Sequence, residues 1–207
     1  MADVALAYAY AEEDRPYELL NGEMVIMAPP AYWHIQIAGN VYNIFRKYLK
    51  GKRCIAMPDG MAVVADKNNI VIPDAMIVCD RKKIRHDGVH GAPDLVVEIL
   101  SPSTRKNDLT KKMKLYERIG VREYWIISPK EKTVDVYILR DGKFELDNSY
   151  HPYEDWELQL MTEDEKKSVL LPLKVSLYDD FMVDVSDIFE NSDIDELLAE
   201  EFDTTLR

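Results

Sequence analysis

Residues 94–100 (DLVVEIL) constrain the fold most, because this short run is apolar on both of its faces. Side chains alternate between the two faces of a strand, so Val96, Glu98 and Leu100 share one face. A strand that is apolar on both faces is typical of the covered centre of a sheet. Glu98 therefore places a carboxylate where burial is expected, and a buried carboxylate requires a cationic partner or a metal ion. An ion pair with a neighbouring lysine or arginine and a functional role both remain open at this point.

A second acidic residue interrupts the apolar run 71–79 (VIPDAMIVC). We predict a strand here with Asp74 in its middle. The alternative is that Pro73 and Asp74 mark a bulge or the start of the strand. A similar Pro-Asp pair at 58–59 is followed by glycine and is better explained as a turn. Asp74 is therefore the second candidate for a functional carboxylate.

The third candidate comes from a helix that we expect to begin at Asn107 or Asp108 and to end at Gly120. At 100° per residue, Lys112 falls inside the apolar arc of this helix. The other basic residues of the helix lie on its opposite face: Lys111, Lys114 and Arg118. A lysine that snorkels from the edge of the apolar stripe is the alternative. We interpret Lys112 as an inward, functional lysine.

The remaining patterns predict one α/β domain. An Asn-Gly pair between apolar runs indicates a hairpin over 17–27, and an apolar stripe indicates a helix over 34–49. Further strands are expected at 53–57, 61–66, 123–128, 133–139, 143–147 and 169–177. We divide the chain into a loose lead (1–16), the domain (17–190) and an acidic tail (191–207). A short helix at 193–202 in that tail could dock onto a partner.

The net charge of −12 argues against a polyanion-binding protein until its distribution is considered. Residues 45–122 hold 17 Lys and Arg against 9 Asp and Glu, so the middle of the chain is basic. We expect the basic residues at 45–53, 81–85 and 105–122 to line one cleft around the site. A nucleic-acid substrate is compatible with this pattern, while the overall acidity keeps a hydrolase of other phosphoesters as an alternative.

The two cysteines and the hydropathy pattern predict a cellular compartment. Cys54 and Cys79 each lie in an apolar run, which indicates buried, reduced thiols rather than a disulfide or a zinc site. No apolar run approaches the roughly 20 residues that span a bilayer. The first residues lack the basic start and the long apolar core of a secretory signal. We therefore expect a cytoplasmic protein that does not enter a membrane.

Asp74, Glu98 and Lys112 form a recognisable chemical set. Paired carboxylates bind Mg²⁺ or Mn²⁺, which are hard cations that prefer oxygen ligands. Such a metal activates a water molecule and neutralises charge on a phosphate. A neighbouring lysine can orient or deprotonate that water, or hold a phosphate oxygen. The set predicts a metal-dependent phosphodiesterase.

Two segments, IVIPDAMIVCD and APDLVVEILSPSTRKNDLTKKMKLYERIGVREYWIISP, resemble the Uma-two family of restriction-endonuclease-like proteins, in the PD-(D/E)XK nuclease superfamily. The resemblance covers 17–189. It implies a mixed central sheet flanked by helices and Mg²⁺- or Mn²⁺-dependent endonucleolytic cleavage of DNA. It makes Asp74 and Glu98 the metal ligands and, with Lys112, the catalytic residues. The superfamily usually has its lysine two residues after the second acid, where this chain has Leu100, so Lys112 on the following helix takes that place.

Weaker patterns concern the hairpin and the helix ends. Glu18 and Glu23 share one face of the hairpin, which we interpret as a solvated face rather than an auxiliary acidic site. His34 is expected to position the first helix rather than to touch phosphate. Arg105 and Lys106 precede a helix, where they could hold a phosphate or simply be exposed.

Three aromatic residues, Tyr124, Trp125 and Tyr137, are expected on an exposed face. Together with the two-fold symmetry of duplex DNA, this face predicts a homodimer. A catalytically retired nucleic-acid-binding or assembly protein on the same scaffold is the alternative to an active nuclease, because an intact fold can carry an inactive centre.

Overall fold

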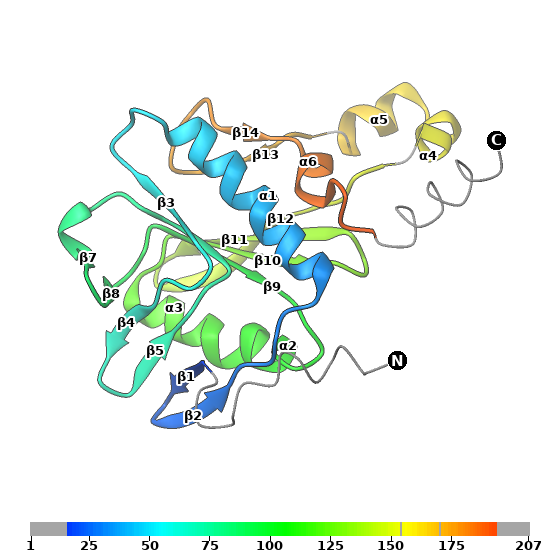
Figure 1. Cartoon of the computed structure of the whole chain (residues 1–207). Helices are drawn as coiled ribbons and strands as arrows, with labels where there is room; N and C mark the ends of the chain where they lie inside the picture. The colour runs from blue at the N-terminus through cyan, green and yellow to red at the C-terminus, as the bar shows by residue number, and fades with distance from the viewer. Residues whose placement is uncertain (1–15, 154, 170, 194–207) are drawn as a thin grey trace, which may run out of the picture.

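The computed structural model describes residues 16–153, 155–169 and 171–193, and its centre is a six-stranded mixed sheet (Figure 1). The strand order is β12-β11-β10-β9-β6-β3, in which β9 and β10 are parallel and the other neighbours are antiparallel. The strands are β3 (Ile55–Pro58), β6 (Ala75–Val78), β9 (Leu95–Ile99), β10 (Glu123–Ser128), β11 (Thr133–Arg140) and β12 (Lys143–Tyr150). All side chains of β6, β9 and β10 are buried, which confirms a covered central strand at 94–100.

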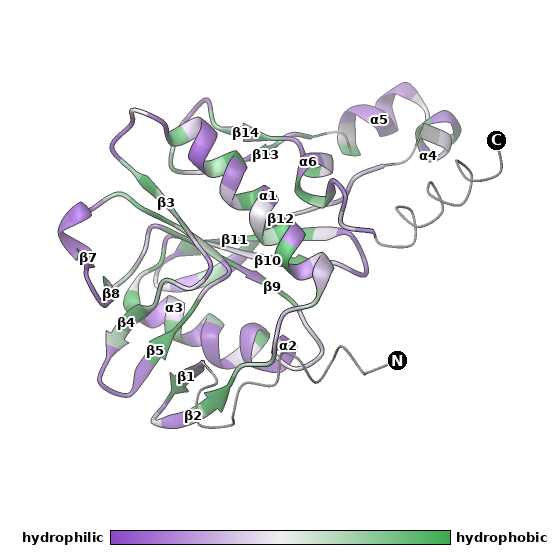
Figure 2. Ribbon diagram, viewed as in Figure 1, coloured by the Kyte–Doolittle hydropathy of each residue, from purple (hydrophilic) through white to green (hydrophobic). Residues whose placement is uncertain are grey.

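Helix α1 (Tyr32–Leu49) covers one face of this sheet (Figure 1). It is amphipathic, with hydrophobic and hydrophilic residues alternating along the ribbon in Figure 2, and its apolar side buries Ile37, Val41 and Phe45. The C-terminal elements pack against the same core. They are β13 (Leu173–Lys174), β14 (Met182–Val183) and α6 (Val185–Phe189).

A helical run covers the opposite face of the sheet. It consists of α2 (Arg105–Asn107), a π-helical turn η4 (Asp108–Lys112) and α3 (Met113–Ile119). Gly120 ends the run in the left-handed conformation (φ 88°), which glycine adopts at little cost. The helix expected from about 107 to 120 is confirmed, and the π-helical turn lies where Asp108 and Lys112 are buried.

A second sheet, ordered β2-β1-β5-β4-β8-β7, packs beside this helical run (Figure 1). It contains β1 (Tyr17–Leu20), β2 (Glu23–Ile26), β4 (Val63–Asp66), β5 (Asn69–Val71), β7 (Ile84–Arg85) and β8 (Gly88–His90). A short helix, η3 (Arg81–Lys83), precedes β7. The strand predicted at 71–79 is divided between β5 and β6, with a break at Pro73 and Asp74, so the alternative of a strand start is the correct one.

The architecture confirms an α+β protein with a mixed central sheet flanked by helices. Some local predictions differ from the structure. Two helices that the sequence patterns do not predict, α4 (Asp155–Leu160) and α5 (Glu163–Val169), lie between β12 and β13, and the strand predicted at 169–177 is only β13. The helix predicted at 193–202 lies almost entirely outside the described residues.

Two predictions about side chains are wrong. Cys54 and Cys79 form a disulfide, because β3 and β6 pair with Ile55 opposite Val78 and so bring the two flanking cysteines face to face. The expected exposed aromatic face does not exist, since Tyr124 and Trp125 are fully buried in the two cores on either side of β10. The homodimer prediction therefore loses the surface on which it was based.

Within the described residues, no helix has the length and apolar character needed to cross a membrane.

Candidate active site

Glu98 lies on the central strand β9 with its side chain buried, 2% exposed. Its Oε2 accepts a hydrogen bond from Lys112 Nζ at 3.0 Å, and its Oε1 accepts one from the Tyr116 hydroxyl at 2.7 Å. Strand β9 fixes the carboxylate from one side, while the helical run brings both donors from the other. Glu98 is thus ion-paired within a buried cluster of polar side chains.

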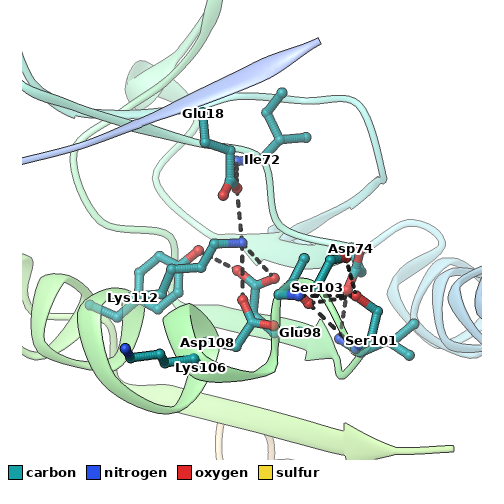
Figure 3. A network of polar contacts seen from close by, with 12 residues as sticks. Glu18, Ile72, Asp74, Glu98, Ser101, Ser103, Lys106, Asp108 and Lys112 are labelled. Carbon is teal, nitrogen blue, oxygen red and sulfur yellow. Dashed lines mark hydrogen bonds and ion pairs between the residues drawn. The ribbon is translucent and has the colours of Figure 1, made fainter. Parts of the chain in front are cut away.

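Lys112 is the centre of this cluster (Figure 3). Its side chain is 3% exposed, which confirms the inward direction predicted from the helical periodicity. Besides Glu98, its Nζ lies 2.8 Å from Glu18 Oε1 and 3.3 Å from Asp108 Oδ1. Neighbouring Lys111 points outward, as predicted, and pairs with the exposed Glu23 at 2.9 Å.

Two buried acids around Lys112, Glu18 and Asp108, are not among the functional residues predicted from the sequence. Glu18 was assigned to a solvated face, but it is buried and its carboxylate also accepts the Ile72 N–H at 2.8 Å. The Glu18 side of the hairpin faces the interior because Leu19 of β1 pairs with Ile70 of β5. Asp108 is buried on the same side of the helix as Lys112, four residues before it. The helical periodicity that selects Lys112 also selects Asp108, so that signal was present.

Asp74 lies beside this cluster, directly before β6 (Figure 3). Its Oδ2 accepts the Ile99 N–H at 2.5 Å, and its Oδ1 lies 2.8 Å from His34 Nε2. Because β6 and β9 are antiparallel with Ala75 opposite Val97, Asp74 and Glu98 follow at adjacent positions of the two strands. His34, expected to position the first helix, therefore also positions the Asp74 carboxylate.

The cluster contains more acidic than basic side chains. Burial raises the pKa of Glu98 well above its ordinary value; Lys112 opposes this effect and the nearby carboxylates add to it. Burial likewise raises the pKa of Asp108. Burial alone would lower the pKa of Lys112, but the surrounding carboxylates outweigh it, so the pKa of Lys112 is well above its ordinary value. Lys112 is therefore protonated within this cluster.

The donor set fits a hard divalent cation. Asp74 and Glu98 offer carboxylate oxygens, the kind of ligand that Mg²⁺ and Mn²⁺ prefer. Both carboxylate oxygens of the buried Asp108 lack a hydrogen-bond partner among the described residues, and its only ion pair there is the 3.3 Å contact with Lys112, so Asp108 keeps free acceptor capacity. No three His, Cys, Asp or Glu side chains in the described part of the chain converge on one metal position. Water or a substrate phosphate would have to supply the remaining ligands, as is usual for Mg²⁺.

The basic residues do not all surround this site, contrary to expectation. Arg53 and Arg81 bond to backbone carbonyls around Cys79, at the end of β6 away from Asp74. Arg118 pairs with Asp66. Arg105 lines a cavity of about 520 Å³ next to the site, whereas Lys106 points away from the Lys112 cluster (Figure 3).

Comparison with known proteins agrees with the fold. Residues 4–169 match the Uma2 family, described as "Putative restriction endonuclease". "Uncharacterized protein slr1290" of Synechocystis sp. is 28% identical over 127 residues, which cover 60% of this chain and 67% of that protein. The crystal structure of "a putative nuclease belonging to DUF820" from Anabaena variabilis superposes with a TM-score of 0.59 at 19% identity, over 87% of this chain and 93% of the other. The match to residues 4–169 covers most of the chain, which therefore belongs to the Uma2 family, the Uma-two family that its sequence resembles.

Proposed function

We propose that this protein is a metal-dependent nuclease that hydrolyses phosphodiester bonds in DNA, with Mg²⁺ or Mn²⁺ held by Asp74 and Glu98. The observation that carries the proposal is the buried Lys112–Glu98 contact of 3.0 Å, beside Asp74, in a member of a family described as "Putative restriction endonuclease". Glu18 and Asp108 add two further acids at the same lysine, so the buried acids outnumber the buried cation. The excess of buried carboxylates is a common property of sites that bind a divalent cation.

Each residue has a distinct part in this proposal. When bound, the metal activates water and neutralises charge on the phosphate. The carboxylates around Lys112 raise its pKa, so its ammonium can stabilise negative charge on the phosphate. His34 holds one Asp74 oxygen, and the Ile99 N–H holds the other. Tyr116 and Lys112 orient Glu98 in the same way.

Metal binding gives the direct test of the ligand assignment. Isothermal titration with Mn²⁺ is expected to show one binding event in the wild type. Asp74→Asn should weaken binding at least about tenfold, because the amide removes the ligand charge while keeping the side-chain shape. Asp87→Asn is the matched control, since Asp87 lies in the β7–β8 turn and pairs with His90. Equal Mn²⁺ affinity in the wild type and Asp74→Asn would reject the assignment.

A catalytically retired nucleic-acid-binding protein is the second candidate. The observation that favours it is the absence, among residues 16–153, 155–169 and 171–193, of three metal-binding side chains around one point. A retired centre would bind DNA with the same affinity in the presence and absence of Mn²⁺ and would leave plasmid DNA intact. The active nuclease is expected to cleave the plasmid only when Mg²⁺ or Mn²⁺ is present.

A homodimer remains part of the proposal because the two antiparallel strands of duplex DNA present phosphates related by a two-fold axis. Light scattering at micromolar concentration measures the mass in solution. A monomeric mass, with or without DNA, would contradict this part of the proposal and would leave the site assignment unchanged.

A further inference from the structure

The cavity of about 520 Å³ beside the candidate active site combines an aromatic side chain with basic ones. Its walls come from the start of α1, from the residues after β9 and from the β10–β11 turn. The lining residues that matter here are Trp33, Leu100, Ser101, Arg105, Lys130 and Lys132. Pockets of about 300–1,000 Å³ take ligands of drug size, and one nucleotide is a ligand of this size.

The cavity is joined to the catalytic carboxylates by two short routes. Along the first, the Trp33 ring lies 5.8 Å from the ring of His34, whose Nε2 contacts Asp74 at 2.8 Å. Along the second, Leu100 and Ser101 directly follow Glu98 and Ile99, and the Ile99 N–H binds Asp74. The cavity wall and the candidate active site are therefore built from adjacent residues of α1 and of the segment that ends β9.

The charges in the cavity favour an anion. Arg105 and Lys130 are exposed, and neither they nor Lys132 form an ion pair with another residue in the described ranges. Elsewhere, several exposed cations are neutralised by carboxylates, as in Lys111–Glu23, Arg118–Asp66 and Lys143–Glu117. The cavity wall also contains two acids, Glu131, whose carboxylate accepts the Ser128 hydroxyl, and Asp193. Three cations against two carboxylates leave the wall with a net positive charge, which favours a phosphate.

Trp33 supplies the second half of a nucleotide site. It is only partly buried and lies at the edge of the core on which α1 packs, so part of its ring faces the cavity. Unpaired bases stack on aromatic side chains, and the neighbouring phosphates are held by lysine and arginine. A base inside a duplex cannot reach a ring recessed in a pocket unless it leaves the stack.

We infer that this cavity binds one unpaired nucleotide of the substrate strand, with its base on Trp33 and its phosphate near Arg105 and Lys130. The inference rests on the proposed nuclease function, because that function brings a phosphodiester to Asp74 and Glu98. It adds that the substrate is engaged through a single-stranded or unstacked nucleotide. The cavity thereby sets the position of the substrate DNA strand relative to the Asp74 and Glu98 carboxylates.

The test measures binding in EDTA, where no cleavage can occur. A labelled single-stranded oligothymidylate is titrated with the wild type, Trp33→Leu, Trp33→Phe and Trp156→Leu, and followed by fluorescence anisotropy. Trp156 is 63% exposed on α4 and serves as the matched control. Trp33→Leu should weaken binding about 5- to 150-fold, the range for loss of one stacked base, and Trp33→Phe should recover part of the loss. Trp156→Leu should bind like the wild type.

An oligomer of the same length without bases separates stacking from charge. Trp33→Leu should bind this abasic probe as the wild type does, whereas Arg105→Ala/Lys130→Ala should weaken the binding of both probes. Arg105 and Lys130 are exposed, so this double variant should fold even where Trp33→Leu does not. Unchanged oligothymidylate binding by Trp33→Leu or by the double variant would overturn the inference. Wild-type binding to oligothymidylate without any metal-dependent cleavage would instead overturn the proposed function alone.

Discussion

Lys112 Nζ lies 2.8 Å from Oε1 of Glu18, and this contact joins the helical run after β9 to the N-terminal hairpin. The two residues are far apart in sequence, and both are almost completely buried. Lys112 thereby receives carboxylates from three directions: the hairpin, the central strand and its own helix. The hairpin is consequently part of the candidate active site and not only a cover for the core.

Removing Glu18 should destabilise the protein. Glu18→Ala leaves the Ile72 N–H and one side of Lys112 without an acceptor, so the free energy of unfolding should fall by about 1–3 kcal/mol. The exposed Glu23, on the same hairpin, is the control, and Glu23→Ala should change stability by less than about 0.5 kcal/mol. Urea unfolding of the two variants measures the difference. Equal effects would mean that the Glu18–Lys112 contact does not stabilise the fold.

Lys112 and Lys111 should differ in their effect on catalysis. Lys112→Gln removes the buried positive charge beside Glu98, and the rate of metal-dependent cleavage should fall at least about 10²-fold. Lys111→Gln removes an outward charge and should change the rate little. Melting temperatures of both variants must be recorded, because Lys112 also compensates three buried carboxylates. If both substitutions lower the rate equally, the helix lysines act only as a diffuse phosphate-binding surface.

The Cys54–Cys79 disulfide should contribute to stability but not to activity. It closes a loop with a sequence separation of 25, for which the chain-entropy account gives about 3 kcal/mol. Dithiothreitol should therefore lower the melting temperature of the wild type, and Cys54→Ser/Cys79→Ser should melt at that lower temperature with or without reductant. The bond lies at the end of β6 opposite Asp74, so cleavage by the double variant should match that of the wild type. A melting temperature insensitive to reductant in the wild type would show that the thiols are free in solution.

Glu123 should make stability depend on pH. Burial raises its pKa above 4.5, although hydrogen bonds from Ser176 and Trp125 oppose the shift. A folded pKa above the unfolded one contributes stability that is complete below pH 4.5 and is lost as pH rises through the folded pKa. The stability of the wild type relative to Glu123→Gln should therefore decrease as pH rises above 4.5. A difference that increases with pH in chemical denaturation would show that the native state favours the ionised carboxylate.

The part of the site that could be predicted from sequence is the part encoded by local periodicity. Glu98 interrupts an apolar strand and Lys112 interrupts an apolar helical arc, so each is anomalous within its own element. Asp108 could have been found in the same way. Glu18 could not, because its face is decided by the pairing of β1 with β5, some 50 residues later in the chain. The side of a two-stranded hairpin that is buried depends on tertiary packing.

The wrong predictions about the cysteines and the aromatic residues also have a long-range cause. The two cysteines are adjacent only because β3 and β6 pair in one particular register, which the hydropathy pattern does not specify. Tyr124 and Trp125 are buried instead of exposed, and their polar atoms have partners: the Tyr124 hydroxyl donates to the Asp108 carbonyl and Trp125 Nε1 to Glu123. Buried aromatic residues with a polar group generally require such partners. Long-range hydrogen bonds of this kind leave no periodic signal in the sequence.

If the Glu98 carboxylate serves a metal-dependent reaction, its substitution should affect cleavage far more than substitution of Glu123. Glu98 and Glu123 are both buried glutamates on the neighbouring strands β9 and β10, but only Glu98 belongs to the Lys112 cluster. Plasmid cleavage with Mn²⁺ should be abolished by EDTA, should fall at least about 10²-fold in Glu98→Gln, and should stay close to the wild-type rate in Glu123→Gln. Cleavage by Glu98→Gln at the wild-type rate, or no cleavage by the wild type with either Mn²⁺ or Mg²⁺, would contradict the account.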